Sequence, residues 1–219
     1  MLRFNLGIIL YILIYIMLSN IQVKDLAKRM GIRLEGVYFK SQLKEMKLKH
    51  NVGYIINLED QYDEDGNPND GSHYTCFLYN KYPKKDCRDE YAYFDSYGVA
   101  PPDEVLEFCG VKEMPYNLID VQSLMNNACG WFCLAFLYYI NVFPQRTMNF
   151  YRDCSHFTSL FNDLNSTNDW KYNEWLLKQF FKSPNSKPTT LESLGFRFIP
   201  NGTNVASGIA DVNSIDSEC

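Results

Sequence analysis

The sequence has few histidines and no paired-cysteine motif. Only three histidines occur in 219 residues, and none of the seven cysteines belongs to a Cys-x-x-Cys pair. An odd number of cysteines without such pairs indicates reduced thiols rather than a disulfide framework. Cys129 and Cys133 share one helix face, but the chain has no further Cys/His pair at finger-like spacing, which argues against zinc. We interpret Cys133 as a helix-packing residue and expect no metal.

Positive charge is also scarce. Lys and Arg number 21 against 26 Asp and Glu, the net charge is -5, and no basic run is present. This balance argues against autonomous DNA binding. The acidic segment 59–70 lacks the register of a calcium loop, because Gly66 at the sixth position would place Gln61 first and Ser72 last. We interpret this segment as a solvated acidic loop.

No apolar run reaches the length of a membrane-spanning helix. The run over residues 6–18 has thirteen residues, fewer than the roughly 17 to 25 that a span needs. It follows Arg3 and fits a signal-peptide h-region or a membrane-associating segment equally well. We treat 1–18 as an appendage, 19–182 as one compact domain that is expected to be monomeric, and the Ser/Asn/Pro-rich residues 183–219 as a largely disordered tail.

The most informative segment that the chain does contain begins at Asn126 and runs to Leu137. It places Cys129 at the start of a stretch that is apolar on every side, which predicts a buried helix. At the N-terminus of a helix, unpaired N–H groups and the positive end of the macrodipole stabilise a thiolate. A cysteine alone is usually an inert core residue. Cys129 becomes a candidate nucleophile only with a suitable base beside it.

His73 is the best-placed base. It opens an apolar run over 74–79, and a second run over 91–94 ends at Asp95 in a turn-like segment. An antiparallel hairpin centred near Lys84 would set residues whose numbers sum to about 168 opposite each other, and His73 and Asp95 meet this condition. A carboxylate there could fix the imidazole tautomer and stabilise its cation.

The other two histidines are weaker candidates for the base, and Gln122 is a candidate oxyanion donor. His50 lies in a Lys-rich stretch and is expected to be solvated, and His156 has no carboxylate in strand register with it. Gln122 stands seven residues before Cys129 and follows an extended apolar segment. Its carboxamide could donate to an oxyanion together with the Cys129 backbone N–H. Helices are also expected between Val23 and Met30, with Ser19 or Asn20 as the N-cap, and over 151–182.

Taken together, these segments resemble adenain-like viral cysteine proteases and, more distantly, SUMO-specific proteases. The resemblance extends from about Leu18 to about Ile140 and keeps the family order of His, Asp, Gln and Cys. One departure is Tyr74, where relatives usually carry tryptophan, although an aromatic lid over the histidine is still available. The residues that carry the resemblance are Gly71-Ser72-His73-Tyr74, Tyr93-Phe94-Asp95-Ser96-Tyr97-Gly98, Gln122 and Cys129-Gly130-Trp131-Phe132-Cys133.

The resemblance implies an α+β cysteine endopeptidase, in which a small mixed β-sheet packs against a buried central helix with the nucleophile at its N-terminus. The implied catalytic set is His73, Asp95, Gln122 and Cys129. The implied substrates are protein precursors, cut after glycine-containing motifs in a virion or in the host cytoplasm or nucleus, with a peptide or DNA as a conceivable activator. Two alternatives stay open: a protease that removes a ubiquitin-like modifier, and a catalytically silent peptide-binding module.

Overall fold

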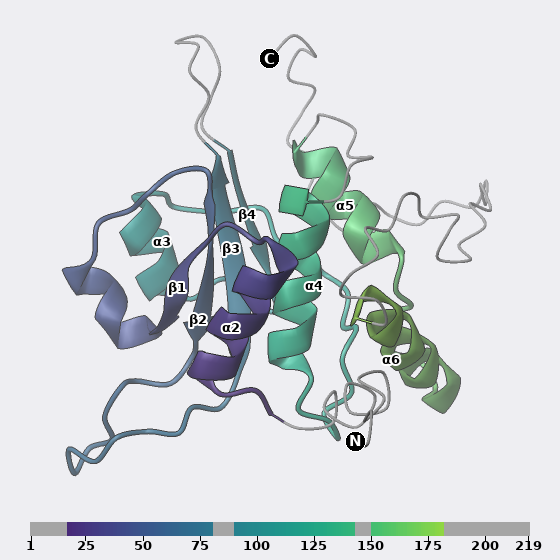
Figure 1. The fold of residues 1–219 in the computed structure, drawn as a ribbon, viewed down its shortest axis with the longest axis horizontal. Helices are drawn as coiled ribbons and strands as arrows, with labels where there is room; N and C mark the ends of the chain where they lie inside the picture. Colours follow the sequence, from purple (N-terminus) through teal and green to yellow (C-terminus); the bar gives the residue numbers. More distant parts are fainter. Residues whose placement is uncertain (1–16, 81–89, 143–149, 182–219) are drawn as a thin grey trace, which may run out of the picture.

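The protein has an α+β fold in which a four-stranded sheet lies between layers of helices (Figure 1). The computed structural model describes residues 17–80, 90–142 and 150–181; most of the apolar segment 6–18, the hairpin loop near Lys84 and the tail 183–219 lie outside them. The elements in chain order are α2 (Asn20–Met30), β1 (Leu34–Phe39), the 3-10 helix η1 (Lys40–Glu45), β2 (Val52–Asn57), β3 (Tyr74–Asn80), β4 (Glu90–Phe94), α3 (Asp103–Cys109), α4 (Cys129–Val142), α5 (Phe150–Ser159) and α6 (Thr167–Phe181).

The sheet is mixed, as the resemblance implied. Its strand order is β1-β2-β3-β4, with β1 and β2 parallel and the other neighbouring pairs antiparallel. Both expected strands of the hairpin are present as β3 and β4, and the expected helices at the C-terminal end are present as α5 and α6. Within the described residues, no helix is long and apolar enough to cross a membrane.

The predicted hairpin register was wrong by two residues. Observed partners such as Cys76 and Phe94, or Phe77 and Tyr93, have numbers that sum to 170 rather than 168. His73 and Asp95 are therefore not directly opposite each other but occupy diagonal positions just beyond the paired strands. Because side chains alternate with a period of two, a two-residue shift keeps both on the same face of the sheet.

The N-terminal end of the described chain is tied to the core. Ser19 caps α2 through a capping box, since its hydroxyl accepts from the Gln22 N–H and the Gln22 side chain accepts from the Ser19 N–H. Leu18 is only 4% exposed and joins the cluster around α4. The last residue of the apolar run thus contributes a core side chain.

Both faces of the sheet are buried, which explains why β2 and β3 are almost continuously apolar. Tyr74, Cys76 and Leu78 of β3 join a cluster with α2, α4, α5 and α6. Phe77 points the other way and packs with Tyr93 and the residues of η1 and α3. In Figure 1, α4 accordingly lies between the sheet and the pair α5 and α6.

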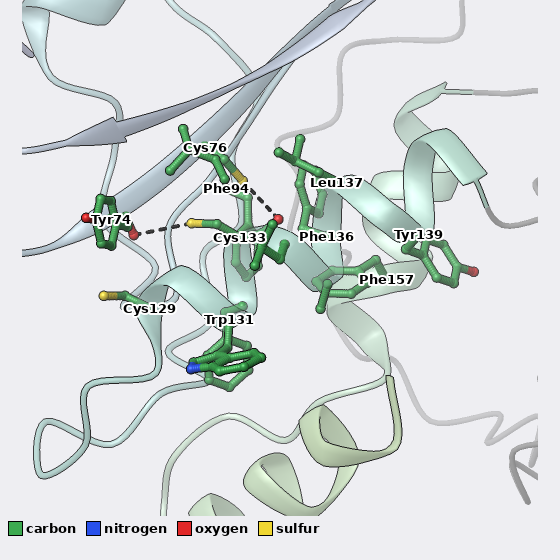
Figure 2. Packing of buried hydrophobic residues seen from close by; sticks show 14 of the residues in the cluster. Tyr74, Cys76, Phe94, Cys129, Trp131, Cys133, Phe136, Leu137, Tyr139 and Phe157 are labelled. Carbon is green, nitrogen blue, oxygen red and sulfur yellow. Dashed lines mark hydrogen bonds between the residues drawn. The ribbon is translucent and has the colours of Figure 1, made fainter. Parts of the chain in front are cut away.

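Helix α4 is fixed to β3 by sulfur contacts as well as by apolar packing. The Cys133 thiol donates to the Tyr74 carbonyl at 3.4 Å, and the Cys76 thiol donates to the Cys133 carbonyl at 3.8 Å (Figure 2). Both cysteines are fully buried. Cys133 therefore packs the helix against the sheet, as its position in the sequence indicated, and holds the start of α4 beside the first residue of β3.

Candidate active site

His73 is held in place by its neighbours on the β2–β3 connection. The Leu58 N–H donates to the His73 carbonyl at 2.9 Å, and the buried Asn57 side chain accepts from the Ser72 N–H at 3.3 Å. Gly71 permits this approach: its φ is +88°, and a Cβ there would lie 1.9 Å from the Asn57 amide nitrogen. The chain thus enters β3 with the His73 backbone already fixed.

Asp95 lies in a tight turn that follows β4 directly. Its Oδ1 accepts from the Tyr97 N–H at 2.8 Å, which is an Asx-turn, and its carbonyl accepts from the Gly98 N–H at 2.9 Å. Gly98 has φ +67°, and a Cβ there would come within 2.9 Å of the Ile119 backbone. A glycine is therefore required for this turn to pack against the segment that leads to Gln122.

A second polar contact fixes the Asp95 backbone. The Asn117 side chain accepts from the Asp95 N–H at 2.9 Å and donates to the Asp95 carbonyl at 2.6 Å. Asn117 is 3% exposed, so these bonds form away from solvent. No local sequence pattern indicates this role, because the two residues are 22 positions apart and only the tertiary fold brings them together.

His73 and Asp95 form the central contact of the site. His73 Nε2 lies 2.8 Å from Asp95 Oδ1, with side chains 14% and 1% exposed. Burial lowers the pKa of His73, but the interactions of the ring with Asp95 and Cys129 outweigh it and raise the pKa to about 9. Since Nε2 is used by Asp95, Nδ1 is the ring nitrogen left for Cys129.

The Asp95 carboxylate depends on this contact. Its Oδ2 is buried and has no hydrogen-bond partner among the described residues. A buried anion is stable only when it is paired. The two groups therefore favour an imidazolium at His73 and hold each other in place.

The aromatic ring on the His73 imidazole is Tyr97. The two rings stack at a centroid distance of 4.6 Å and an interplanar angle of 28°. Tyr74, which was expected to be the available aromatic lid, packs near Gly130 at the start of α4, and its hydroxyl donates to the Asn20 side chain at the start of α2. The Asx-turn pattern of Asp95-Ser96-Tyr97-Gly98 was the only signal in the sequence that could have indicated Tyr97.

Gln122 is buried at the same end of the fold, and its side chain is fully engaged. Its Oε1 accepts from the Ser96 hydroxyl at 2.7 Å, while Nε2 donates to the Tyr97 hydroxyl at 3.1 Å and to the Asn126 carbonyl at 3.0 Å. A carbonyl can only accept, so the contact with Asn126 fixes which end of the amide is nitrogen. A substrate oxygen must therefore share or replace one of these two acceptors.

Cys129 is the first residue of α4 and is 3% exposed. Ala128 immediately precedes the helix, and its carbonyl accepts from the Trp131 and Phe132 N–H groups at 2.9 and 3.0 Å. The Asn126 side chain in turn accepts from the Ala128 N–H at 3.2 Å. The cysteine consequently sits where a helix offers unpaired N–H groups and its positive end.

The other two histidines lie elsewhere. His50 is exposed, and His156 lies on α5, where its ring hydrogen-bonds the Tyr139 hydroxyl of α4 at 2.6 Å. Among the described residues, no group of three or more His, Cys, Asp or Glu side chains could hold a metal ion. The structure thus joins His73 to Asp95 directly, and it links Gln122 to the turn after Asp95 through Tyr97 and to the start of α4 through Asn126.

Comparison of the sequence with protein-family models and with curated proteins found no match. Any functional conclusion therefore depends on the geometry of this site and on the chemistry of its side chains.

Proposed function

We propose that the protein is a cysteine endopeptidase with Cys129 as nucleophile and His73 as general acid and base. The observation that carries the proposal is the buried 2.8 Å contact between His73 Nε2 and Asp95 Oδ1, made by an imidazole that also interacts with Cys129 at a helix N-terminus. A nucleophile, a base and a group that orients the base are the minimum set for thiol-dependent acyl transfer.

In the proposed reaction, Cys129 Sγ attacks the scissile carbonyl carbon as a thiolate. The peptide C–N bond breaks, the leaving amine takes the proton from His73 Nδ1, and a thioester forms. His73 then removes a proton from water, which attacks the thioester, releases the carboxylic acid product and restores the thiolate and the imidazolium. Asp95 keeps the ring oriented through both steps and stabilises its cationic form.

Gln122 and the Cys129 N–H are the proposed donors to the oxyanion. The Gln122 carboxamide is already oriented by Ser96 and Asn126, so it needs no reorganisation beyond release of the Tyr97 hydroxyl. Preorganised donors of this kind contribute most when charge develops on the substrate oxygen.

The surroundings of the site support a polypeptide substrate with a small residue next to the cut. Cys129 is almost completely covered, so only a narrow segment of chain can reach it. The loop between Gln122 and Cys129 exposes Leu124 and Met125 by 81% and 94%. Large exposed apolar side chains beside a catalytic centre are suited to hold an extended peptide. With the resemblance to adenain-like proteases, this favours protein precursors cut after glycine-containing motifs.

A glycine-tailed probe with a C-terminal electrophile tests the proposal. Reaction of a peptide probe with the full chain should give one adduct at Cys129 by peptide mapping, and the adduct should disappear in Cys129→Ala and persist in the matched variant Cys133→Ala. Preferential labelling by a ubiquitin-like protein with the same electrophile would instead favour removal of such a modifier. Absence of any adduct at Cys129 would overturn the enzymatic proposal in favour of a silent peptide-binding module.

A further inference from the structure

Helix α6 touches the candidate site although it lies beyond the segment that carries the protease resemblance. Two adjacent polar residues on its inner face, Asn173 and Glu174, are 1% and 6% exposed. Leu176 and Leu177 on the same face are fully buried in the core cluster. Apolar packing of α6 is thus provided by the leucines, and the buried polar pair calls for a separate explanation.

Asn173 holds the start of the segment that carries Gln122. Its Nδ2 donates to the Val121 carbonyl at 3.0 Å and to the Asn162 carbonyl at 2.6 Å, and its Oδ1 accepts from the Asn162 N–H at 2.8 Å. Val121 immediately precedes Gln122 in the chain. The Val121 and Gln122 N–H groups both donate to the Ser96 carbonyl, so this stretch is fixed on two sides.

Glu174 holds the other end of the same segment. Its Oε1 accepts from the Asn126 side-chain amide at 2.7 Å. Asn126 also contacts both sides of the site: its carbonyl accepts from Gln122 Nε2, and its Oδ1 accepts from the Ala128 N–H next to Cys129. A hydrogen bond to a carboxylate is stronger than one between neutral groups. The orientation of Asn126 therefore depends on Glu174, and the orientation of the Gln122 carboxamide depends on Asn126.

We infer that Glu174, supported by Asn173, is a positioning residue that aims Gln122 at the oxyanion through Asn126, so that α6 is part of the catalytic apparatus. The inference rests on the proposed protease function. It assigns to α6 a role beyond packing, because the two polar residues fix both ends of the segment 121–126.

The test is steady-state kinetics of the full chain on a fluorogenic peptide amide that ends in Leu-Gly-Gly. Glu174→Ala should lower kcat about 10- to 100-fold, which is less than the roughly 100- to 1000-fold cost of removing an oxyanion donor outright. KM and the rate of Cys129 alkylation by iodoacetamide should stay within about twofold, since neither requires the oxyanion donor. Glu174→Gln keeps an acceptor oxygen and should recover most of kcat, and Lys171→Ala, on the exposed face of α6, is the matched control.

A double-mutant cycle with Gln122→Ala separates positioning from simple structural support. If Glu174 acts through Gln122, then Glu174→Ala should cause no further loss of kcat in the Gln122→Ala background. If the losses of kcat in the two single variants multiply in the double variant, or if the alkylation rate falls in parallel with kcat, the positioning role is overturned. The protease proposal stands in that case as long as the wild-type protein cleaves the peptide. A wild-type protein that neither cleaves the peptide nor reacts with the glycine-tailed probe would overturn both.

Discussion

Raising the pH from about 6.5 to about 9 should destabilise the protein through His73. The pKa of His73 is about 9 in the folded protein, against about 6.5 in an unfolded chain. A group whose pKa is raised by folding contributes stability that is complete below the unfolded value and is lost as the pH passes the folded value. The difference of about 2.5 pKa units corresponds to about 3 kcal/mol. The side chain is 14% exposed, so solvent screening reduces this figure only slightly.

The assay is urea unfolding followed by tryptophan fluorescence at several pH values between 6 and 9.5. The informative quantity is the difference in unfolding free energy between wild type and His73→Gln, because groups common to both proteins cancel. This difference should shrink by about 3 kcal/mol across the window. In Asp95→Asn the loss of stability should be complete at a lower pH than in wild type, since the carboxylate that raises the pKa of His73 is gone. His50→Gln, which replaces an exposed histidine, is the control variant.

A constant difference between wild type and His73→Gln over this range would refute the reasoning. It would mean that the folded imidazole titrates like an exposed one, so that the contact with Asp95 does not favour the cation. The proposed imidazolium at His73 would then not be available to stabilise the Cys129 thiolate. Repeating the series in Cys129→Ala measures how much of the effect belongs to Asp95 alone.

Three further outcomes are expected. Gln122→Ala should lower kcat about 100- to 1000-fold while iodoacetamide still alkylates Cys129 at the wild-type rate; loss of alkylation would contradict a role confined to the oxyanion. Limiting iodoacetamide at neutral pH should label Cys129 ahead of Cys133, because burial raises the pKa of the Cys133 thiol. Peptide mapping measures the order of labelling, and earlier labelling of Cys133 would contradict the prediction. Gly98→Ala should lower Tm more than Gly110→Ala: both glycines have positive φ, but only at Gly98 would a Cβ strike backbone, at 2.9 Å, and equal shifts in scanning calorimetry would contradict this contact.

The local parts of the fold could be predicted from the sequence, whereas the pairing of distant segments could not. The apolar runs of β3 and β4 depend on neighbouring residues, and they were predicted correctly. Of the two expected caps, Ser19 and Asn20, the structure has Ser19. The hairpin register was wrong because it was inferred from an assumed centre at Lys84. The sequence also contains no local signal for the parallel pairing of β1 with β2, which joins segments across an intervening 3-10 helix.

The same division applies to the site. The proximity of His73 and Asp95 was predicted despite the register error, because a shift of two residues leaves both side chains on one face. The roles of Asn117 and Asn126 escaped prediction, since a polar amide gives no hint of its partner until the fold brings the partner close. Asn173 and Glu174 are further cases, because their bonds to Val121 and Asn126 span 52 and 48 positions of sequence.

The orientation of the β3–β4 hairpin has a practical consequence. His73 precedes the first residue of β3 and Asp95 follows the last residue of β4, whereas Asn80 and Glu90 pair at the other end of the two strands. At about 3.3 Å per residue, the seven steps from His73 to Asn80 separate this end from the His73 imidazole by roughly 23 Å. A fluorophore or an affinity tag introduced between Asn80 and Glu90 would therefore label or immobilise the protein at a distance from the contact between His73 and Asp95.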